Sequence, residues 1–109
     1  MIHLIVGNTG SGKTTYSAKL KRKTNGIVFS IDKWNKMLFL ADKKPDDGLK
    51  WFLERIDRAE EMIMELVQQL ENSKTDAILD LGFSKFEHRE KFRKFAKLNG
   101  YELKIHFLD

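Results

Sequence analysis

The chain contains no cysteine and only one proline among its 109 residues. Without thiols it can form neither a disulfide framework nor a thiolate metal site. It has no apolar run near the roughly 20 residues that a membrane-spanning helix needs, no internal repeat and no low-complexity tract. Because a predicted strand begins at Ile2, we expect no signal peptide. These absences favour one cytoplasmic domain over residues 1–109 with no membrane partner.

The composition is that of an ordinary globular domain, with 41% hydrophobic and 33% charged residues. Twenty basic residues against sixteen acidic ones give a net charge of +4. This excess suits an anionic ligand, but it is too small to indicate nucleic acid by itself. The composition leaves the oligomeric state open.

The most informative stretch is GNTGSGKT, from Gly7 to Thr14, which fits the P-loop or Walker A pattern G-x-x-x-x-G-K-[ST]. The apolar run 2–6 before it predicts a buried strand, and the residues from Thr15 to Lys23 predict a helix. We expect Gly26 to cap that helix in a left-handed conformation. A strand, a glycine-rich loop and a helix in this order are the context that the motif requires.

This arrangement predicts a phosphate site, because glycines let the backbone approach a ligand and successive N–H groups then point at its oxygens. The helix N-terminus adds its unpaired N–H groups and its dipole. Lys13 would place a cation on the outer phosphates, and the Thr14 hydroxyl would ligate Mg²⁺. The predicted ligand is ATP (or GTP) with Mg²⁺. The predicted nucleotide-binding residues are Gly7, Asn8, Thr9, Gly10, Ser11, Gly12, Lys13, Thr14 and Thr15.

The rest of the chain alternates strands with helices. We predict strands over 27–31, 77–81 and 101–108, helices over 33–40 and 49–72, and a last helix that begins at a capping box, Ser84 to Glu87, and ends near Leu98. The turn 43–48 is expected to be exposed. The apolar stripe of the long helix is predicted to be core: Phe52, Ile56, Ala59, Ile63, Leu66, Val67 and Leu70.

Alternating strands and helices predict an α/β fold: a three-layer sandwich with a parallel sheet in the order 2-3-1-4 and helices on both faces. In such a fold the ligand binds at the carboxyl ends of the strands. Gly7, Asp32 and Asp80 all fall at that edge.

Asp80 ends the apolar run Ala77 to Leu79 and matches the Walker B element, whose carboxylate binds Mg²⁺. The alternative is a strand-end Asp that hydrogen-bonds a nearby loop. The next residue is Leu81 rather than the water-activating Glu typical of hydrolytic AAA motors, so the sequence disfavours a motor. Asp32 is expected to end the second strand and to cap the helix beginning at Lys33. A carboxylate there can also accept the proton of an acceptor hydroxyl.

Together, GNTGSGKT, Ser30-Ile31-Asp32 and Ala77 to Asp80 resemble the small P-loop kinases and AAA-like ATPases. That group includes 5′-hydroxyl polynucleotide kinases, chloramphenicol phosphotransferase and zeta-toxin-like kinases. The resemblance implies that Lys13 and Thr14 hold ATP and Mg²⁺, and that Asp32 acts as base or orients the acceptor. The implied catalytic residues are Asp32 and Lys13, and the implied metal ligands are Thr14 and Asp80.

Two departures from that group matter. Polynucleotide kinases typically place an Arg where this chain has Asn35, and Lys33 or Lys36 lacks the bidentate fork of Arg. Members also continue past the fourth strand into a lid helix and a fifth strand. We therefore expect residues 1–109 to be part of a longer protein, with lid and last strand absent.

The sequence thus predicts an ATP-dependent phosphotransferase that acts on a hydroxyl of a small-molecule or nucleic-acid acceptor. A slow nucleotide-hydrolysing regulatory module and a nucleic-acid 5′-end kinase remain alternatives. Three further expectations are structural. His3 and His106 pack or hydrogen-bond, and Trp34 and Trp51 pack. The basic residues of the last helix form a solvated face: Lys85, His88, Arg89, Lys91, Arg93, Lys94 and Lys97.

Overall fold

The computed structural model describes residues 1–8, 10–81 and 86–108. Strands and helices alternate along them, as predicted. The strands are β1 (Ile2–Val6), β2 (Ile27–Ser30), β3 (Ala77–Asp80) and β4 (Leu103–Phe107). The helices are α1 (Lys13–Thr24), α2 (Ile31–Leu38), the 3₁₀ helix η1 (Leu40–Asp42), α3 (Leu49–Asn72) and α4 (Phe86–Asn99). None of the helices in the described part of the chain is long and apolar enough to cross a bilayer.

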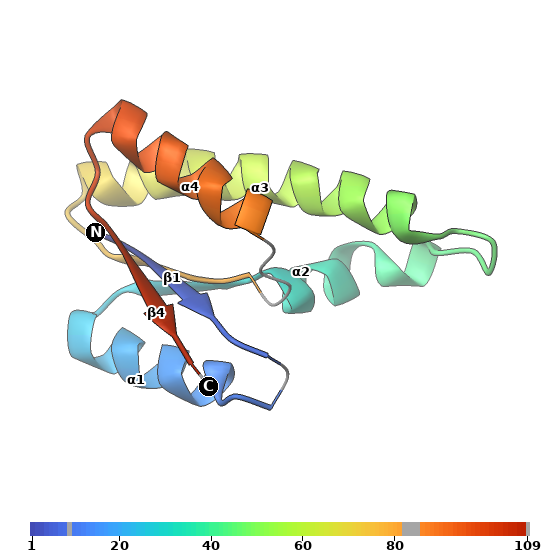
Figure 1. Cartoon of the computed structure of the whole chain (residues 1–109), viewed down its shortest axis with the longest axis horizontal. Coiled ribbons are helices and arrows are strands. Elements are labelled where there is room, and N and C mark those ends of the chain that lie inside the picture. Colours follow the sequence, from blue (N-terminus) through green and yellow to red (C-terminus); the bar gives the residue numbers. More distant parts are fainter. Residues whose placement is uncertain (9, 82–85, 109) are drawn as a thin grey trace.

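The four strands form one parallel sheet in the order β2-β3-β1-β4, which confirms the predicted topology. Helix α1 covers one face of the sheet, and α3 and α4 cover the other (Figure 1). Asp80, the last residue of β3, lies beside Ile5 of β1 and Ser30 of β2. All strands therefore present their carboxyl ends at the same edge.

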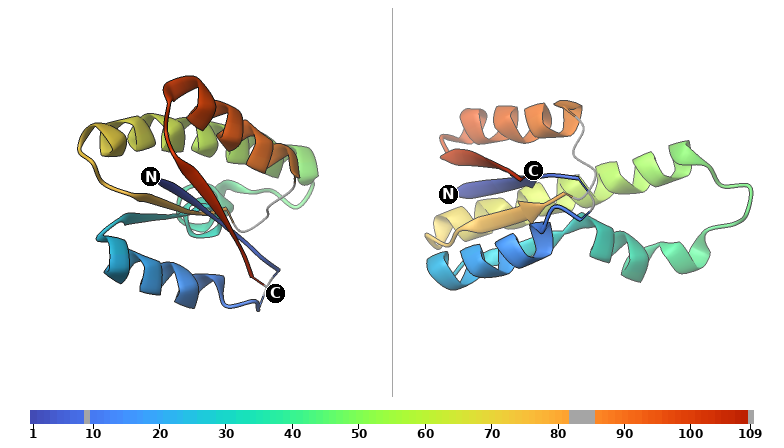
Figure 2. Two further views of the ribbon diagram at one scale, coloured as in Figure 1. Left: turned by 60° about the vertical axis from the view of Figure 1, so that its left-hand side comes forward. Right: turned by 60° about the horizontal axis from the view of Figure 1, so that its bottom comes forward.

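Helix α2 and the N-terminal half of α3 project beyond that edge (Figure 2). The C-terminal half of α3 packs on the sheet, where Ala59, Ile63 and Val67 are buried against β1 and β3. Helix α4 contributes Phe92 and Ala96 to the same core. The predicted stripe of α3 is thus core from Ile56 onward, but Phe52 lies outside the core cluster because the sheet does not extend beneath it.

The predicted start of the second helix is wrong. Strand β2 ends at Ser30, and α2 begins at Ile31. Ser30 is the N-cap, and its Oγ accepts a hydrogen bond of 3.4 Å from the Lys33 N–H. Asp32 is therefore not the cap. It lies in the first turn of α2, where its charge complements the helix dipole.

The predicted cap at Gly26 is also wrong. Asn25 takes the left-handed conformation, with φ 59°, and its N–H donates to the Lys21 carbonyl at 2.8 Å. Gly26 is needed for a different reason: a Cβ there would lie 2.8 Å from the Asp76 carbonyl oxygen. The predicted capping box falls on Ser84 and Lys85, which lie outside the described residues.

The two tryptophans pack, as expected. Trp34 lies against the core and meets the Phe29 ring edge-on, with centroids 5.8 Å apart. Trp51 contacts Phe52 edge-on and carries the Arg55 guanidinium over its face, 4.1 Å from the ring centroid. Both rings are thus occupied by contacts within the chain.

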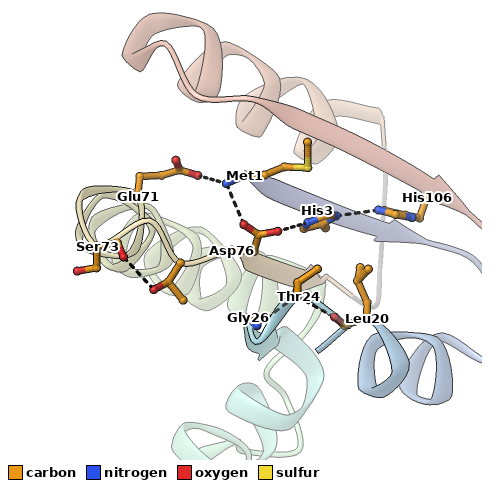
Figure 3. A network of polar contacts seen from close by, with 10 residues as sticks. Met1, His3, Leu20, Thr24, Gly26, Glu71, Ser73, Asp76 and His106 are labelled. Atoms are coloured by element: carbon orange, nitrogen blue, oxygen red, sulfur yellow. Dashed lines mark hydrogen bonds and ion pairs between the residues drawn. The ribbon is translucent and has the colours of Figure 1, made fainter. Parts of the chain in front are cut away.

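A chain of polar contacts crosses the sheet beneath α1 and contains both strand histidines (Figure 3). The N-terminal amine lies 3.3 Å from Asp76, whose other oxygen is 2.8 Å from His3 Nε2. His3 Nδ1 is 3.0 Å from His106 Nε2, and the Tyr16 hydroxyl bonds His106 Nδ1. The expectation that His3 and His106 hydrogen-bond is confirmed.

These contacts are mutually satisfied when both rings are neutral. Tyr16 then donates to His106, His106 donates to His3, and His3 donates to the Asp76 carboxylate. Burial alone would raise the pKa of Asp76, but the hydrogen bond from His3 and the N-terminal charge outweigh it and hold that pKa below its usual value. Burial, together with the charges of His3 and Lys104, lowers the pKa of His106.

Candidate active site

The loop between β1 and α1 has the backbone that its glycines predict. Gly10 and Gly12 have φ of 83° and 88°, a region that residues with a Cβ rarely adopt. Gly7 is needed for close packing, because a Cβ there would lie 2.5 Å from Ser11 Oγ. The loop is closed by the Ser11 N–H, which donates to the Asn8 carbonyl at 3.0 Å.

The N-terminus of α1 follows directly. Gly12 is its N-cap residue and has no side chain to offer, and the first turn contains no acidic residue. The cap residue therefore makes no side-chain hydrogen bond to the first N–H groups of this helix. These groups and the positive end of the dipole are suited to an anion.

An open groove of about 810 Å³ lies between this loop, α1 and the start of α2. Five of the predicted nucleotide-binding residues line it, and so do both predicted carboxylates. They are Gly10, Gly12, Lys13, Thr14, Thr15, Asp32 and Asp80. The groove does not include Gly7, Asn8 or Ser11 among its lining residues, and Thr9 lies outside the described ones.

Asp80 reaches the groove from the end of β3 and is only 8% exposed. The Thr14 hydroxyl lines the same groove from the first turn of α1. A carboxylate and a hydroxyl are hard oxygen ligands of the kind that Mg²⁺ prefers. Thr14 and Asp80 are therefore the residues that would hold a magnesium ion.

Sequence reasoning considered Lys33 and Lys36 near the substrate phosphate but missed Lys21. Lys21, Lys33 and Lys36 line the groove together with Lys13, so four lysines face two aspartates. Lys21 lies eight residues after Lys13 on α1, a spacing that keeps both on one helix face. A helical projection of 13–24 would have found it. The excess positive charge suits a polyphosphate.

A second pocket of about 390 Å³ adjoins the groove and was not predicted. It is formed by α2, η1 and the N-terminal half of α3. Asp32 and Lys36 line both cavities. Its lining residues are Asp32, Asn35, Lys36, Leu40, Leu49, Phe52, Leu53 and Ile56.

The predicted solvated face of α4 is only partly right. Arg93, Lys94 and Lys97 are exposed, but His88 and Lys91 bind α3. His88 Nδ1 lies 2.9 Å from one oxygen of Glu60, and Lys91 Nζ lies 3.6 Å from the other. The sequence pattern hid this contact because Glu60 falls among solvent-facing glutamates of α3.

Glu60 is 1% exposed, and its burial raises its pKa, although the charges of His88 and Lys91 oppose the shift. Atoms of Asp57, Glu60 and His88 suited to a metal ion lie within 4.8 Å of one another. The Lys91 ammonium, 3.6 Å from Glu60, offsets part of the negative charge of that group. The arrangement therefore joins α3 to α4 electrostatically.

Arg89 of α4 lies near two aromatic rings, one at the start of α4 and one at the end of β4. Its guanidinium lies 5.7 Å from the centroid of Phe86 and 5.8 Å from that of Phe107. Its Nε is buried and without a hydrogen-bond partner among the described residues. Arg89 thus links α4 to the end of β4, and it does not line the groove.

Comparison with solved structures finds the same fold in several kinases. A chain of the Pnkp1/Rnl/Hen1 complex has a TM-score of 0.74 at 20% identity, over 99% of this chain and 35% of its own. The APS kinase CysC of Mycobacterium tuberculosis has a TM-score of 0.72 at 19% identity, and the match covers 99% of this chain and 74% of that one. A protein described as a putative kinase from Chloroflexus aurantiacus has a TM-score of 0.72 at 16% identity, and the match covers 98% of this chain and 58% of that one.

This chain thus spans about a third of the first of these structures and about three-quarters of the second. The comparison with curated protein sequences finds no match. A family model described as an AAA domain matches residues 2–109, which is nearly the whole chain. The chain therefore belongs to this AAA-domain family and has the fold of the P-loop kinases.

Proposed function

We propose that this chain transfers a phosphoryl group from ATP (or GTP) to a hydroxyl of an acceptor. The observation that carries the proposal is the groove itself, which gathers the glycine-rich loop, Lys13, Thr14, Asp32 and Asp80 from four separate elements. Its charge suits the phosphates, and its two carboxylates are placed for separate tasks. Kinases among the structures of the same fold add support.

In the proposed reaction, the oxygen of the acceptor hydroxyl attacks the γ-phosphorus and forms a new P–O bond. The bond from that phosphorus to the β-phosphate oxygen breaks, and ADP keeps the electron pair. Asp32 accepts the hydroxyl proton and later returns it to water. Lys13 and the N–H groups of the loop stabilise the charge on the phosphates. Mg²⁺, held by Thr14 and Asp80, would neutralise further phosphate charge.

The test is a titration of the ¹⁵N-labelled protein with ADP and with ATP in the presence of Mg²⁺, followed by amide NMR. We expect the largest shifts at residues 10–15, and Lys13→Ala should weaken binding by about 10-fold or more, as removal of a charged phosphate contact does. If the chemical-shift changes lie outside residues 10–15, or if Lys13→Ala binds nucleotide as tightly as the unchanged protein, the phosphate site is refuted.

A matched pair on α1 tests the groove's electrostatics. Lys21 lines the groove, whereas Lys19, also exposed, does not. Lys21→Gln should weaken ATP binding by about 2- to 5-fold, since a solvent-screened charge contributes less than about 1 kcal/mol. Lys19→Gln should leave it nearly unchanged. Equal losses in the two variants would mean that net charge, rather than the groove, attracts the nucleotide.

Acceptor-dependent turnover separates the proposed kinase from a regulatory nucleotide-binding module. Asp80 is followed by Leu81, so the position of a water-activating Glu is apolar. We therefore expect slow hydrolysis of ATP alone and a rise in ADP release when an acceptor is present. Rapid hydrolysis that no hydroxyl compound accelerates would favour the module.

A further inference from the structure

The pocket beside the phosphate groove has mostly apolar walls. Five of its eight lining residues are leucine, isoleucine or phenylalanine. Leu49, Phe52, Leu53 and Ile56 follow the three- and four-residue steps of one α3 face. Leu49 is 62% exposed, so apolar surface is left open to water at the mouth of this pocket. Such concave apolar surface is typical of small-molecule sites.

The polar groups of the pocket are few, and their charges balance. Asp32 and Lys36 are its charged lining residues, of opposite sign and one helical turn apart on α2. Asn35 Oδ1 is buried and has no hydrogen-bond partner among the described residues. A buried acceptor without a donor is unfavourable, so a ligand donor would stabilise it once the Asn35 amide turns toward the pocket, because in this conformation the oxygen is not accessible from the pocket.

The position of the pocket relates it to the groove. Asp32, the proposed base, lines both cavities, so a molecule in the pocket can place a hydroxyl next to that carboxylate. The volume of about 390 Å³ lies at the small end of ligand pockets, which measure roughly 300–1,000 Å³.

We propose, on the basis of the function above, that this pocket binds the acceptor and that the acceptor is a small, uncharged, amphipathic alcohol. Its apolar body lies against Phe52, Leu53 and Ile56. Its N–H or O–H group donates to Asn35 Oδ1, and its reactive hydroxyl meets Asp32. The end of a nucleic acid suits the pocket less, because Lys36 is its only cationic lining residue within the described chain and Asp32 balances it.

The test uses the nucleotide-free protein labelled at its leucine and isoleucine methyl groups. N-acetylphenylalaninol is the probe, because it combines an aromatic ring, an amide N–H and one hydroxyl without charge. We expect shifts at Leu49, Leu53 and Ile56 with a Kd on the order of 1 mM, as is ordinary for a molecule of this size. Thymidine 3′-monophosphate, which has a 5′ hydroxyl and a phosphate, should leave these methyl groups unchanged.

Two variants and a control separate this pocket from a general apolar surface. Leu49→Ser and Asn35→Leu should each weaken probe binding by about 5-fold or more, through a lost apolar contact and a lost hydrogen bond. The control is Met37→Ser on α2, because Met37 is 74% exposed and outside the pocket lining. It should bind the probe like the unchanged protein.

Three outcomes would overturn the proposal: no shift at these methyl groups, a stronger response to thymidine 3′-monophosphate, or equal binding by Leu49→Ser and Met37→Ser. ADP titrations of the same samples keep this result apart from the proposed function. If ADP shifts residues 10–15 but the probe does not bind, the pocket proposal alone fails. If ADP does not bind, the proposed function fails.

Discussion

Asp32 and Asp80 carry the same chemical group in different surroundings. Asp80 is nearly buried at the end of β3, beside the strand that leads into the loop. Asp32 is exposed in the first turn of α2, at the junction of groove and pocket. The first position suits a group that holds an ion in place, and the second suits a group that meets an incoming hydroxyl.

Substitution of each carboxylate should therefore affect a different quantity. Asp32→Asn should leave ATP affinity within about 2-fold and slow transfer by roughly 10²- to 10⁴-fold, the usual range for a lost general base. Asp80→Asn should lower the affinity for ATP in the presence of Mg²⁺ by about 10- to 100-fold. Calorimetric titration with and without Mg²⁺ and a turnover assay measure both. Identical effects of the two variants would contradict the assignment of separate roles.

The sequence pattern assigns several glutamates of α3 to its solvent face. Among them, substitution of Glu60 should lower the stability of the fold most. Glu60→Ala removes the shared partner of His88 and Lys91 and should destabilise the fold by up to about 3 kcal/mol, the low end for a broken buried pair, since both cations can partly rehydrate. Glu61→Ala is the control, because Glu61 is 70% exposed and Lys91 is its ion-pair partner among the described residues. Urea unfolding of both variants measures the difference, and equal midpoints would contradict it.

At the scale of elements, the polar chain across β1, β4 and α1 makes stability depend on pH. The folded state lowers the pKa of both His106 and Asp76, so the unfolded chain takes up protons first as the pH falls. The contribution of His106 is present above its unfolded pKa near 6.5 and declines below it. That of Asp76 is present above its unfolded pKa near 3.8 and is lost as the pH falls through its lower folded pKa.

We therefore expect the melting temperature to fall between pH 7.5 and pH 5. The free energy of unfolding should decrease by no more than about 1.4 kcal/mol per pH unit for each proton that the unfolded chain takes up. Protonation of His106 would also remove an acceptor from Tyr16 and add a second donor near Lys104. His106→Gln should flatten this part of the profile. An unchanged slope in the variant would show that another group titrates. Thermal unfolding followed by circular dichroism at several pH values is the measurement.

At the scale of the whole molecule, the fold has a part built on the sheet and a projecting part. The sheet and the middle of α3 share one core that includes Ile2, Leu79 and Ile63. Helix α2, η1 and the start of α3 extend past the sheet edge (Figure 2). They expose the apolar residues Met37, Leu38, Leu40 and Leu49. The groove proposed for phosphates lies where the two parts meet, since Asp32, Lys33 and Lys36 of α2 line it together with the loop and α1, and the apolar pocket lies within the projecting part.

Hydrogen exchange should report this division. Amides of β1, β3 and Ala59–Val67 should exchange only through near-global unfolding, whereas those of α2 and residues 49–53 should open at much lower free energy because few buried contacts hold them. Exchange followed by mass spectrometry measures both groups. Uniform protection along α3 would show that its projecting half is as firmly held as the half on the sheet.

Much of this architecture is determined locally. The periodic stripe and the turn before it set α3 at Leu49–Asn72 as predicted, and alternation with right-handed crossovers leaves few sheet orders besides the observed one. The loop conformation follows from Gly10 and Gly12, because only glycine adopts their φ readily. The gathering of Lys13, Asp32 and Asp80 follows from parallel strands that end at one edge.

Other features depend on which side chains meet across elements that are distant in the sequence. The need for Gly26 follows from its close approach to Asp76 on another segment, whereas the cap at Ser30 instead of Asp32 is a matter of local backbone geometry. The Glu60–His88 contact and the pocket at Asn35 arise only when α3 packs on α4 and α2. The sequence alone thus determined the sheet, the loop and the edge where the loop meets Asp32 and Asp80, because these follow from periodicity and backbone sterics. Only the tertiary structure decided the buried pair and the pocket, because helix packing selects their partners.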